Sequence, residues 1–303
     1  MGMISGAIDS ALESIGTSML NGGEWFIQAG YKMWQQCSSI TLTYVERNPM
    51  SQASAWGIVT GGIFMISMAV AASLSVLFFV LGWLRESIDI RNTFTLENMF
   101  RFFIRYAITA SLIVNSLSVV TAITQCASAV VSTISVETSG DDMKGAFDEL
   151  KETLEKDDEA DGGTYLAYGF CGLIGGLIGG MVIIVCGVSI VLAVLSRLFK
   201  LLLCIPFAPV AFAGFAGGGE FSQSGIAWIR SFIGYALEAV VIALAITISF
   251  GLFKDASLFS TGSKDTGVVA MVLMICEYCM PMITASACVK GAEITVRRCL
   301  GLG

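Results

Sequence analysis

The sequence contains no histidine among its 303 residues, and only 14% of the residues are charged. Histidine is the usual acid–base group at neutral pH and a frequent zinc ligand, so its absence argues against triad-type catalysis and imidazole metal sites. The 24 acidic residues outnumber the 17 basic ones, giving a net charge of −7. This charge argues against a surface that holds nucleic acid over its whole area. We therefore expect a non-enzymatic protein without a cofactor.

Long uncharged stretches point to a membrane protein. Hydrophobic residues make up 55% of the chain, and the mean hydropathy is +0.78. About 20 apolar residues suffice to span a bilayer. The uncharged stretches comprise 37 residues between Arg47 and Arg85, 31 between Arg105 and Glu137, 35 between Asp161 and Arg197, and 19 between Lys200 and Glu220. Two more, between Arg230 and Lys254 and between Asp265 and Lys290, are each interrupted by one glutamate. The predicted fold is an all-α protein with several membrane spans.

The stretch after Lys200 decides the number of spans. It contains Pro206 and Pro209 and ends in Gly217, Gly218 and Gly219, residues that break a helix. If it enters the membrane and returns, ten Lys and Arg residues lie inside and seven outside, whereas a full crossing leaves no charge bias. The positive-inside rule then favours five spans plus this re-entrant segment, with the N-terminus outside and the C-terminus inside. Six full spans are the alternative.

Four consecutive segments follow from this plan. Residues 1–53 form amphipathic extracytoplasmic helices, which lie at the membrane surface or pack against protein. Residues 54–136 hold the first two spans and a basic cytoplasmic turn. Residues 137–164 form an outside loop with a short helix, and 11 of the 24 acidic residues lie between Glu137 and Asp161. Residues 165–303 hold the glycine-rich third span, the re-entrant segment and the last two spans.

Gly172, Gly176 and Gly180 recur every four residues on one face of the third span. Glycine lets helix backbones approach closely in a membrane, so this face predicts close helix contacts in an assembly. A phosphate-binding loop would require a preceding strand and a following Gly-Lys-Ser/Thr, and the sequence has neither.

Charged residues near the apolar stretches are the other candidate sites. Glu238 and Glu277 lie inside the last two spans, where a carboxylate forms part of an ion or proton path or joins helices by hydrogen bonds. Arg197, Lys200 and Arg230 bracket the re-entrant segment. In an oligomer they would surround the cytoplasmic mouth of a central passage through that segment, and the alternative is that they only set topology and touch lipid headgroups.

The stretch from Arg197 to Leu252 carries a family resemblance. A helix ends in Pro-Phe-Ala-Pro, a glycine-rich break follows, and the segment around Trp228 leads into the next apolar helix. This order resembles the TrbL-like family of conjugal transfer proteins, polytopic inner-membrane subunits of type IV secretion systems. In that family a proline-containing turn and a tryptophan-bearing segment occupy the places taken here by Pro206, Pro209 and Trp228.

The resemblance implies a channel or scaffold subunit present in several copies. Its partners would be copies of itself, other membrane subunits of the secretion system, cytoplasmic ATPases, the bilayer and, transiently, single-stranded DNA. It would help to move DNA or protein or to build a pilus. The alternative function is an ion- or proton-coupled transporter of small molecules, which predicts two similar halves with a broken helix in each.

Overall fold

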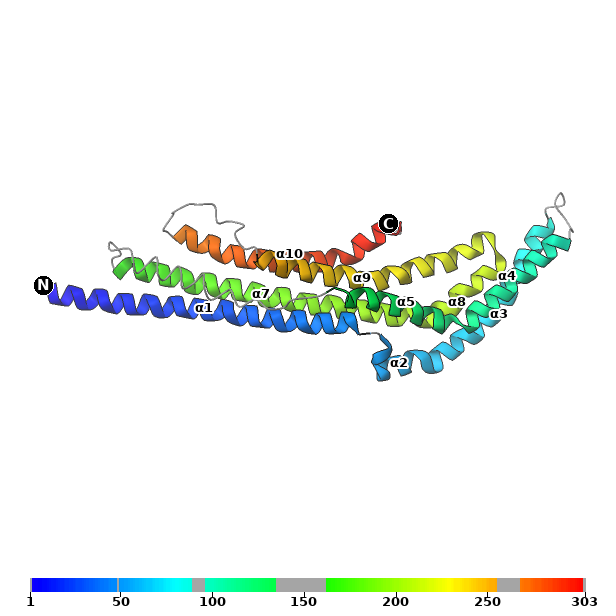
Figure 1. Ribbon diagram of the computed structural model, residues 1–303, viewed down its shortest axis with the longest axis horizontal. Coiled ribbons are helices and arrows are strands. Elements are labelled where there is room, and N and C mark those ends of the chain that lie inside the picture. Colours follow the sequence, from blue (N-terminus) through cyan, green and yellow to red (C-terminus); the bar gives the residue numbers. More distant parts are fainter. Residues whose placement is uncertain (1, 48, 89–95, 135–161, 255–267, 302–303) are drawn as a thin grey trace. The chain divides into compact units, whose positions relative to one another are not determined.

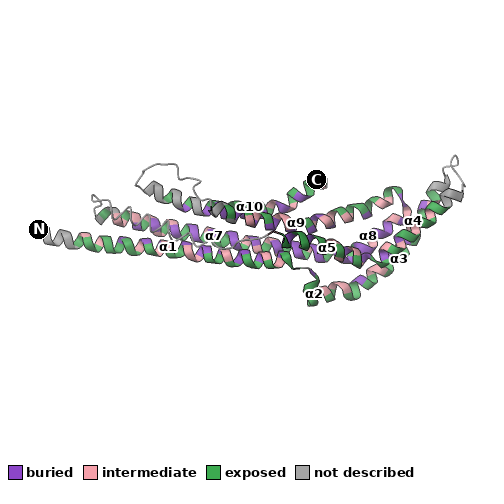
Figure 2. Cartoon of the chain, in the orientation of Figure 1, coloured by how far each residue is buried: buried purple, intermediate pink, exposed green. Residues whose placement is uncertain are grey.

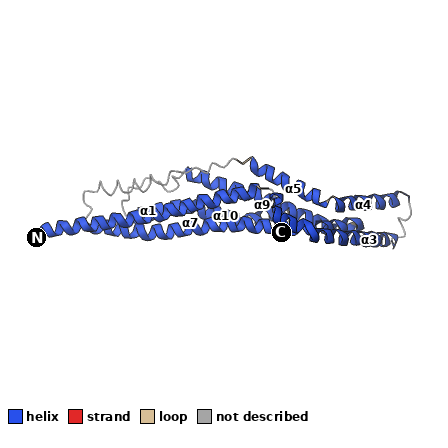
Figure 3. Ribbon diagram, turned by 90° about the horizontal axis from the view of Figure 1, so that it is seen from below, coloured by secondary structure: helices blue, strands red, loops and turns tan. Residues whose placement is uncertain are grey.

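The computed structural model describes residues 2–47, 49–88, 96–134, 162–254 and 268–301. Within these residues the regular structure is helical and contains no strand, as Figure 3 shows, which confirms the all-α prediction. The α-helices are α1 (Gly2–Glu46), α2 (Ala53–Ile58), α3 (Phe64–Ile88), α4 (Leu96–Val114), α5 (Ser116–Ser132), α7 (Gly162–Cys204), α8 (Ala208–Ala213), α9 (Ser222–Lys254) and α10 (Val268–Cys299). Short turns connect several of them: η1 (Pro49–Ser51), η2 (Val59–Ile63), η4 (Ile205–Phe207), η5 (Gly214–Gly217) and η6 (Gly219–Phe221).

Three helical runs in the described part are long and apolar enough to cross a membrane: Ala53–Arg85, Tyr165–Gly217 and Gly219–Ser249. A fourth forms if α4 and α5, which bend by 66° between Val114 and Ser116, count as one broken span. The chain is therefore a membrane protein with three to four candidate spans among its described residues. The predicted five spans with a re-entrant segment stay a prediction, and most of the predicted acidic loop lies outside the described residues.

The chain divides into two compact units, each built from separate stretches of sequence. The first comprises Met1–Thr43, Ile134–Ala193 and Ala243–Lys290, and the second comprises Tyr44–Thr133, Val194–Ile242 and Gly291–Gly303. Helices α7, α9 and α10 each contribute residues to both units.

In the first unit, α1 packs along α7 through a row of glycines. Gly16, Gly23 and Gly30 follow one another at intervals of seven, and each faces the backbone of α7. Leu20, Ile27 and Trp34 repeat the same interval and are buried. A seven-residue interval keeps one helix face against its partner. The two helices run in the same direction, as Figure 1 shows, because Gly16 meets Tyr165 and Gly30 meets Gly180.

In the second unit, α3 runs beside α8 and the turns that flank it. The Ser67 hydroxyl donates to the carbonyl of Pro206 near the start of α3, and Arg85 pairs with Glu220 near its end. The core between these contacts holds Phe64, Ala71, Ile113, Leu201, Phe212 and Phe232. The outer face of α3 is apolar and exposed, as the green stretches of Figure 2 show, which suits contact with lipid.

Candidate functional site

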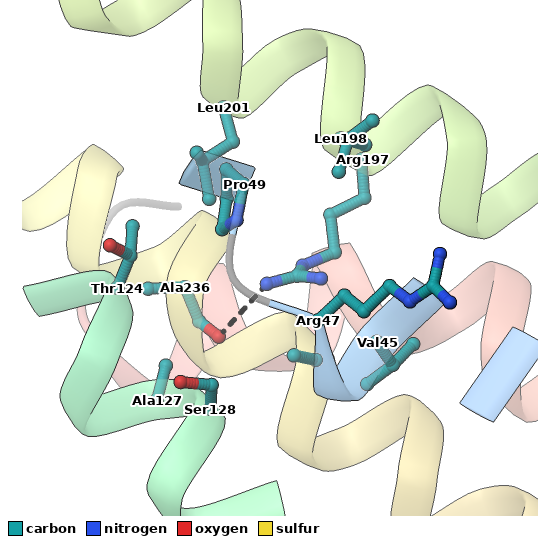
Figure 4. A pocket seen from close by; sticks show the side chains of 11 residues that line it. Val45, Arg47, Pro49, Thr124, Ala127, Ser128, Arg197, Leu198, Leu201 and Ala236 are labelled. Carbon is teal, nitrogen blue, oxygen red and sulfur yellow. Dashed lines mark hydrogen bonds between the residues drawn. The ribbon is translucent and has the colours of Figure 1, made fainter. Parts of the chain in front are cut away.

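Arg197 of α7 is almost fully buried in the second unit, with 7% of its surface exposed. Its Nε donates to the carbonyl of Tyr235 at 2.7 Å, and Nη2 donates to the carbonyl of Ala236 at 3.4 Å. Figure 4 shows the guanidinium reaching the α9 backbone. A buried guanidinium needs such acceptors because it has left water. Arg197 therefore fastens α7 to α9.

Glu238 follows on α9 and is also buried, with 5% of its surface exposed. Its Oε2 atom has no hydrogen-bond partner among the described residues. Arg197 interacts with Glu238 electrostatically, although the two side chains do not form an ion pair. The predicted intramembrane acid is thus opposed by a cation on a neighbouring helix. Glu277 lies in α10, and its side chain is outside the described part.

A second charged group joins α7, α9 and α10. Lys200 forms an ion pair with Glu293, and Arg297 pairs with the same carboxylate at 2.9 Å. Arg297 also donates to the Tyr235 hydroxyl at 3.0 Å. The hydrogen bond from Lys200 holds the pKa of the Glu293 carboxyl below its ordinary value, and the charges of Lys200 and Arg297 add to the effect. Sequence reasoning missed Glu293, although its spacing of four residues from Arg297 is the signal of a helical ion pair.

The structure therefore separates the three cations that sequence reasoning grouped at a passage mouth. Arg197 and Lys200 are engaged by carbonyls and by Glu293. Arg230 is exposed on α9, and none of the described residues forms a hydrogen bond or an ion pair with its side chain. Among these three cations, only the Arg230 side chain is not held by a contact inside the second unit.

A pocket borders Arg197 in the second unit (Figure 4). Eleven residues line it: Val45, Arg47, Pro49, Thr124, Ala127, Ser128, Arg197, Leu198, Leu201, Ala236 and Ala239. Arg47, at the end of α1, thus borders the same pocket as Arg197.

The predicted re-entrant segment directly follows α7 and is helical as far as Gly217. The run Tyr165–Gly217 passes through Pro206 and Pro209, both of which are buried. The chain then turns at Gly218 and Gly219, whose φ angles of 63° and 47° favour glycine. The guanidinium of Arg105 lies where a Cβ on Gly218 would be.

Protein covers part of this segment within the second unit, while Phe207 is exposed. Gly217 packs against Phe78 and Gly82 of α3, and Phe212 meets the Trp228 ring edge to face with centroids 5.3 Å apart. Irregular backbone at membrane depth requires protein or water around it, and here protein provides the contacts.

The glycines predicted to pack helices lie against α1 in the first unit. A Cβ on Gly176 would lie 2.6 Å from the Cα of Gly23, and one on Gly180 would lie 2.5 Å from the Phe26 carbonyl oxygen. The backbone of Gly172 also faces Gly23. The contacts are thus made inside one chain, with a helix that sequence reasoning assigned only to the membrane surface or to protein packing. The seven-residue interval of Gly16, Gly23 and Gly30 was the signal for this partner.

The described side chains do not include a cluster of three or more Cys, Asp or Glu that could hold a metal ion. The polar groups that do converge are cations with carbonyls and carboxylates. Such a set fixes helices to one another or attracts anions.

Comparison with known families fits this site. The model of the TrbL/VirB6 plasmid conjugal transfer proteins matches residues 72–287, more than two thirds of the chain. The chain belongs to the TrbL/VirB6 family. No curated protein and no solved structure matches it.

The matched range of the TrbL/VirB6 chain contains Arg197, Arg230, Glu238 and the proline and glycine segment. The whole of α1 and the pair Glu293 and Arg297 lie outside it. The family match therefore covers the α7 to α9 contact but not the α10 residues that hold Lys200. Membership makes this membrane protein a component of a conjugal transfer, or type IV secretion, system.

Proposed function

We propose that this chain is a non-enzymatic channel or scaffold subunit of a conjugative type IV secretion system and that it works as an oligomer. Its partners are copies of itself, other membrane subunits and the cytoplasmic ATPases that supply energy. It helps to translocate DNA or protein or to build a pilus. The proposal refines the family assignment and draws on one observation about α7.

The observation is the length of an exposed apolar face. The helix α7 has 43 residues, or about 65 Å at a helix rise of about 1.5 Å per residue. Large apolar side chains are exposed along most of it: Phe170, Ile178, Met181, Val185, Leu192, Phe199 and Leu203. The hydrocarbon core of a bilayer is about 30 Å thick. Lipid alone is too thin to cover this face, and neighbouring copies or partner subunits would cover the rest.

We further propose the cytoplasmic membrane as the location, with the N-terminus outside and the C-terminus inside. The distribution of Lys and Arg supports this orientation. Reporter fusions after Gly140 and Gly303 test this orientation.

The experiment for the channel or scaffold role is purification of the tagged full-length chain from cells that carry its conjugative plasmid. Native mass measurement in nanodiscs should give several copies per particle, and secretion-system subunits should copurify. A monomer without such subunits would contradict the proposal.

The transporter alternative is tested by reconstitution in vesicles. A coupled transporter would acidify or deplete the vesicle lumen when an ion gradient is applied, and Glu238→Gln would abolish this flux. The channel or scaffold role predicts no coupled flux from the purified chain.

A further inference from the structure

Three of the long apolar stretches end at basic residues. The stretch on α7 ends at Arg197, that on α9 begins after Arg230, and that on α10 ends at Lys290. Apart from Glu238 and Glu277 these stretches are uncharged, and each is long enough to cross a bilayer. A membrane helix takes up cations where it leaves the hydrocarbon. The sequence therefore marks these three positions as the ends of membrane-crossing stretches.

Contacts in the second unit join residues beside these three ends. Arg197 donates to the carbonyl of Tyr235 on α9 at 2.7 Å, and Lys200 forms an ion pair with Glu293 on α10. Tyr235, Lys200 and Glu293 each lie within about one and a half helical turns of the end of their stretch. The three ends thus lie at one level, which suits the level of phospholipid headgroups.

The charged side chains at this level carry a positive excess. Lys200 and Arg297 share the carboxylate of Glu293, and Arg298 follows on the next position of α10. The Arg297 side chain keeps 46% of its surface exposed, and its guanidinium lies over the Tyr235 ring, 5.7 Å from the centroid. Arg298 is exposed as well. Three cations with one carboxylate make this end of α10 attractive to an anion.

Large apolar side chains are exposed beside these cations. Ile294 precedes Arg298 by four residues on α10, so the two lie on one side of the helix, and 56% of Ile294 is exposed. On α7, Phe199 and Leu203 lie before and after Lys200 and are 64% and 65% exposed. A soluble anion makes no use of such side chains. A phospholipid does, because its acyl chains cover apolar surface while its phosphate meets the cations.

We propose that the end of α10, with Arg297, Arg298 and the neighbouring Lys200, binds the phosphate headgroups of anionic phospholipids. Arg298 and the exposed part of Arg297 contact the phosphate, and Lys200 adds positive charge while its pair with Glu293 ties α10 to α7. The buried Arg197 and Glu238 beside this group have opposite formal charges and leave its excess unchanged. The inference does not depend on the role of the chain in secretion.

The first test compares two lipids on the purified full-length chain in mild detergent. Phosphatidylglycerol and phosphatidylcholine with the same acyl chains are titrated separately, and native mass spectrometry counts the bound molecules. Wild type should bind the anionic lipid at least about tenfold more tightly than the zwitterionic one. Equal affinity for the two lipids would overturn the proposal.

The second test locates the site. Arg298→Gln should weaken the binding of phosphatidylglycerol about fivefold, the equivalent of about 1 kcal/mol for one basic residue at an anionic surface. Arg298→Lys keeps the charge and should stay within about twofold of wild type. Lys32→Gln is the matched control, because it removes the same charge from an exposed position on α1, and it should change binding less than about twofold. Equal losses in Arg298→Gln and Lys32→Gln would reduce the effect to net charge and overturn the assignment to α10.

Two further measurements distinguish the lipid from other anions. Inorganic phosphate at constant ionic strength should not displace phosphatidylglycerol, and displacement would show that the apolar side chains take no part. Arg298→Glu should lose at least about tenfold in lipid binding at an unchanged Tm. If this variant binds the lipid as wild type does but no longer retains another subunit on purification from cells, the surface docks a protein and the lipid assignment is wrong.

These measurements fail separately from the proposed function. They use the purified chain and need no conjugative apparatus. Loss of the lipid preference would leave the secretion role intact, and an unaffected mating frequency after deletion of the gene would leave the lipid site intact.

Discussion

Gly23 of α1 and Gly176 of α7 touch backbone to backbone: a Cβ added to Gly176 would lie 2.6 Å from the Cα of Gly23. Carbon atoms of real side chains do not approach a backbone this closely, so one methyl group would push the helices apart. The contact repeats along the row of glycines that follows α1. The row is what allows the first unit to hold two long helices side by side.

The first prediction therefore concerns alanine at this contact. Gly176→Ala should lower the stability of the protein by about 1–3 kcal/mol through overpacking, although alanine is the better helix former. Gly163→Ala is the matched control on the same helix, because a Cβ there would meet nothing within 4 Å. Thermal unfolding in detergent should give a lower Tm for the first variant and an equal or higher Tm for the control. Equal shifts in both would show that the glycine contact does not form.

The second prediction concerns Arg197 and Glu238. Arg197→Gln removes the cation that opposes a buried carboxylate and the donors to two α9 carbonyls, and leaving such buried groups without a partner costs about 1–3 kcal/mol. Glu238→Gln combined with Arg197→Gln should recover part of this loss, because no uncompensated charge then remains. A double-mutant cycle of chemical unfolding in mixed micelles measures the coupling. Strictly additive effects would contradict an electrostatic link between these two residues.

The third prediction follows from the lowered pKa of Glu293. A carboxyl whose pKa is lower in the folded protein contributes stability that is complete above its unfolded pKa of about 4.3 and is lost as pH falls through the folded value. Glu293→Gln should thus destabilise the protein at pH 7, and its Tm difference from wild type should shrink below about pH 4.

Glu220→Gln is the control for this series. Glu220 pairs with Arg85, and both side chains are mostly exposed to solvent, at 73% and 62%. Exposed pairs contribute little stability. Two results would contradict this explanation. Glu220→Gln could lower the Tm as much as Glu293→Gln does, or the effect of Glu293→Gln could be independent of pH. Either result would show that the ion pairs of Glu293 do not stabilise the protein.

The fourth prediction concerns topology. Reporter fusions after Gly140 and Gly303 should report the outside and the cytoplasm respectively, as the charge count requires. Identical compartments for the two fusions would rule out the five-span plan.

Composition and charge spacing were sufficient for the fold class and the family. Unbroken apolar stretches such as that between Arg47 and Arg85 predict membrane helices because a bilayer imposes their length. The family resemblance depended on the order of Pro206, Pro209 and Trp228. A proline break and a tryptophan anchor can be identified from the local sequence, without knowledge of long-range contacts. Both features are local in sequence.

The candidate site depended on contacts between distant residues and could be predicted only in part. The sequence does not distinguish the roles of the three cations. In the structure, Arg197 donates to α9 carbonyls, Lys200 pairs with Glu293, and Arg230 is exposed. The positions of charged residues in the sequence do not determine which cation pairs with which acceptor. The partner of Gly176 was missed for a similar reason, since a glycine row describes one face and not the helix that covers it.

The most direct test of the central claim is an in-frame deletion of this gene in its conjugative element, complemented by the wild-type chain from a second plasmid. Mating should fall to background in the deletion strain and return with the wild-type chain. The secretion ATPases should remain at normal levels, because the missing part is the membrane subunit and not the energy source. Unchanged mating frequency in the deletion strain would contradict the account of this chain as a required membrane component of conjugal transfer.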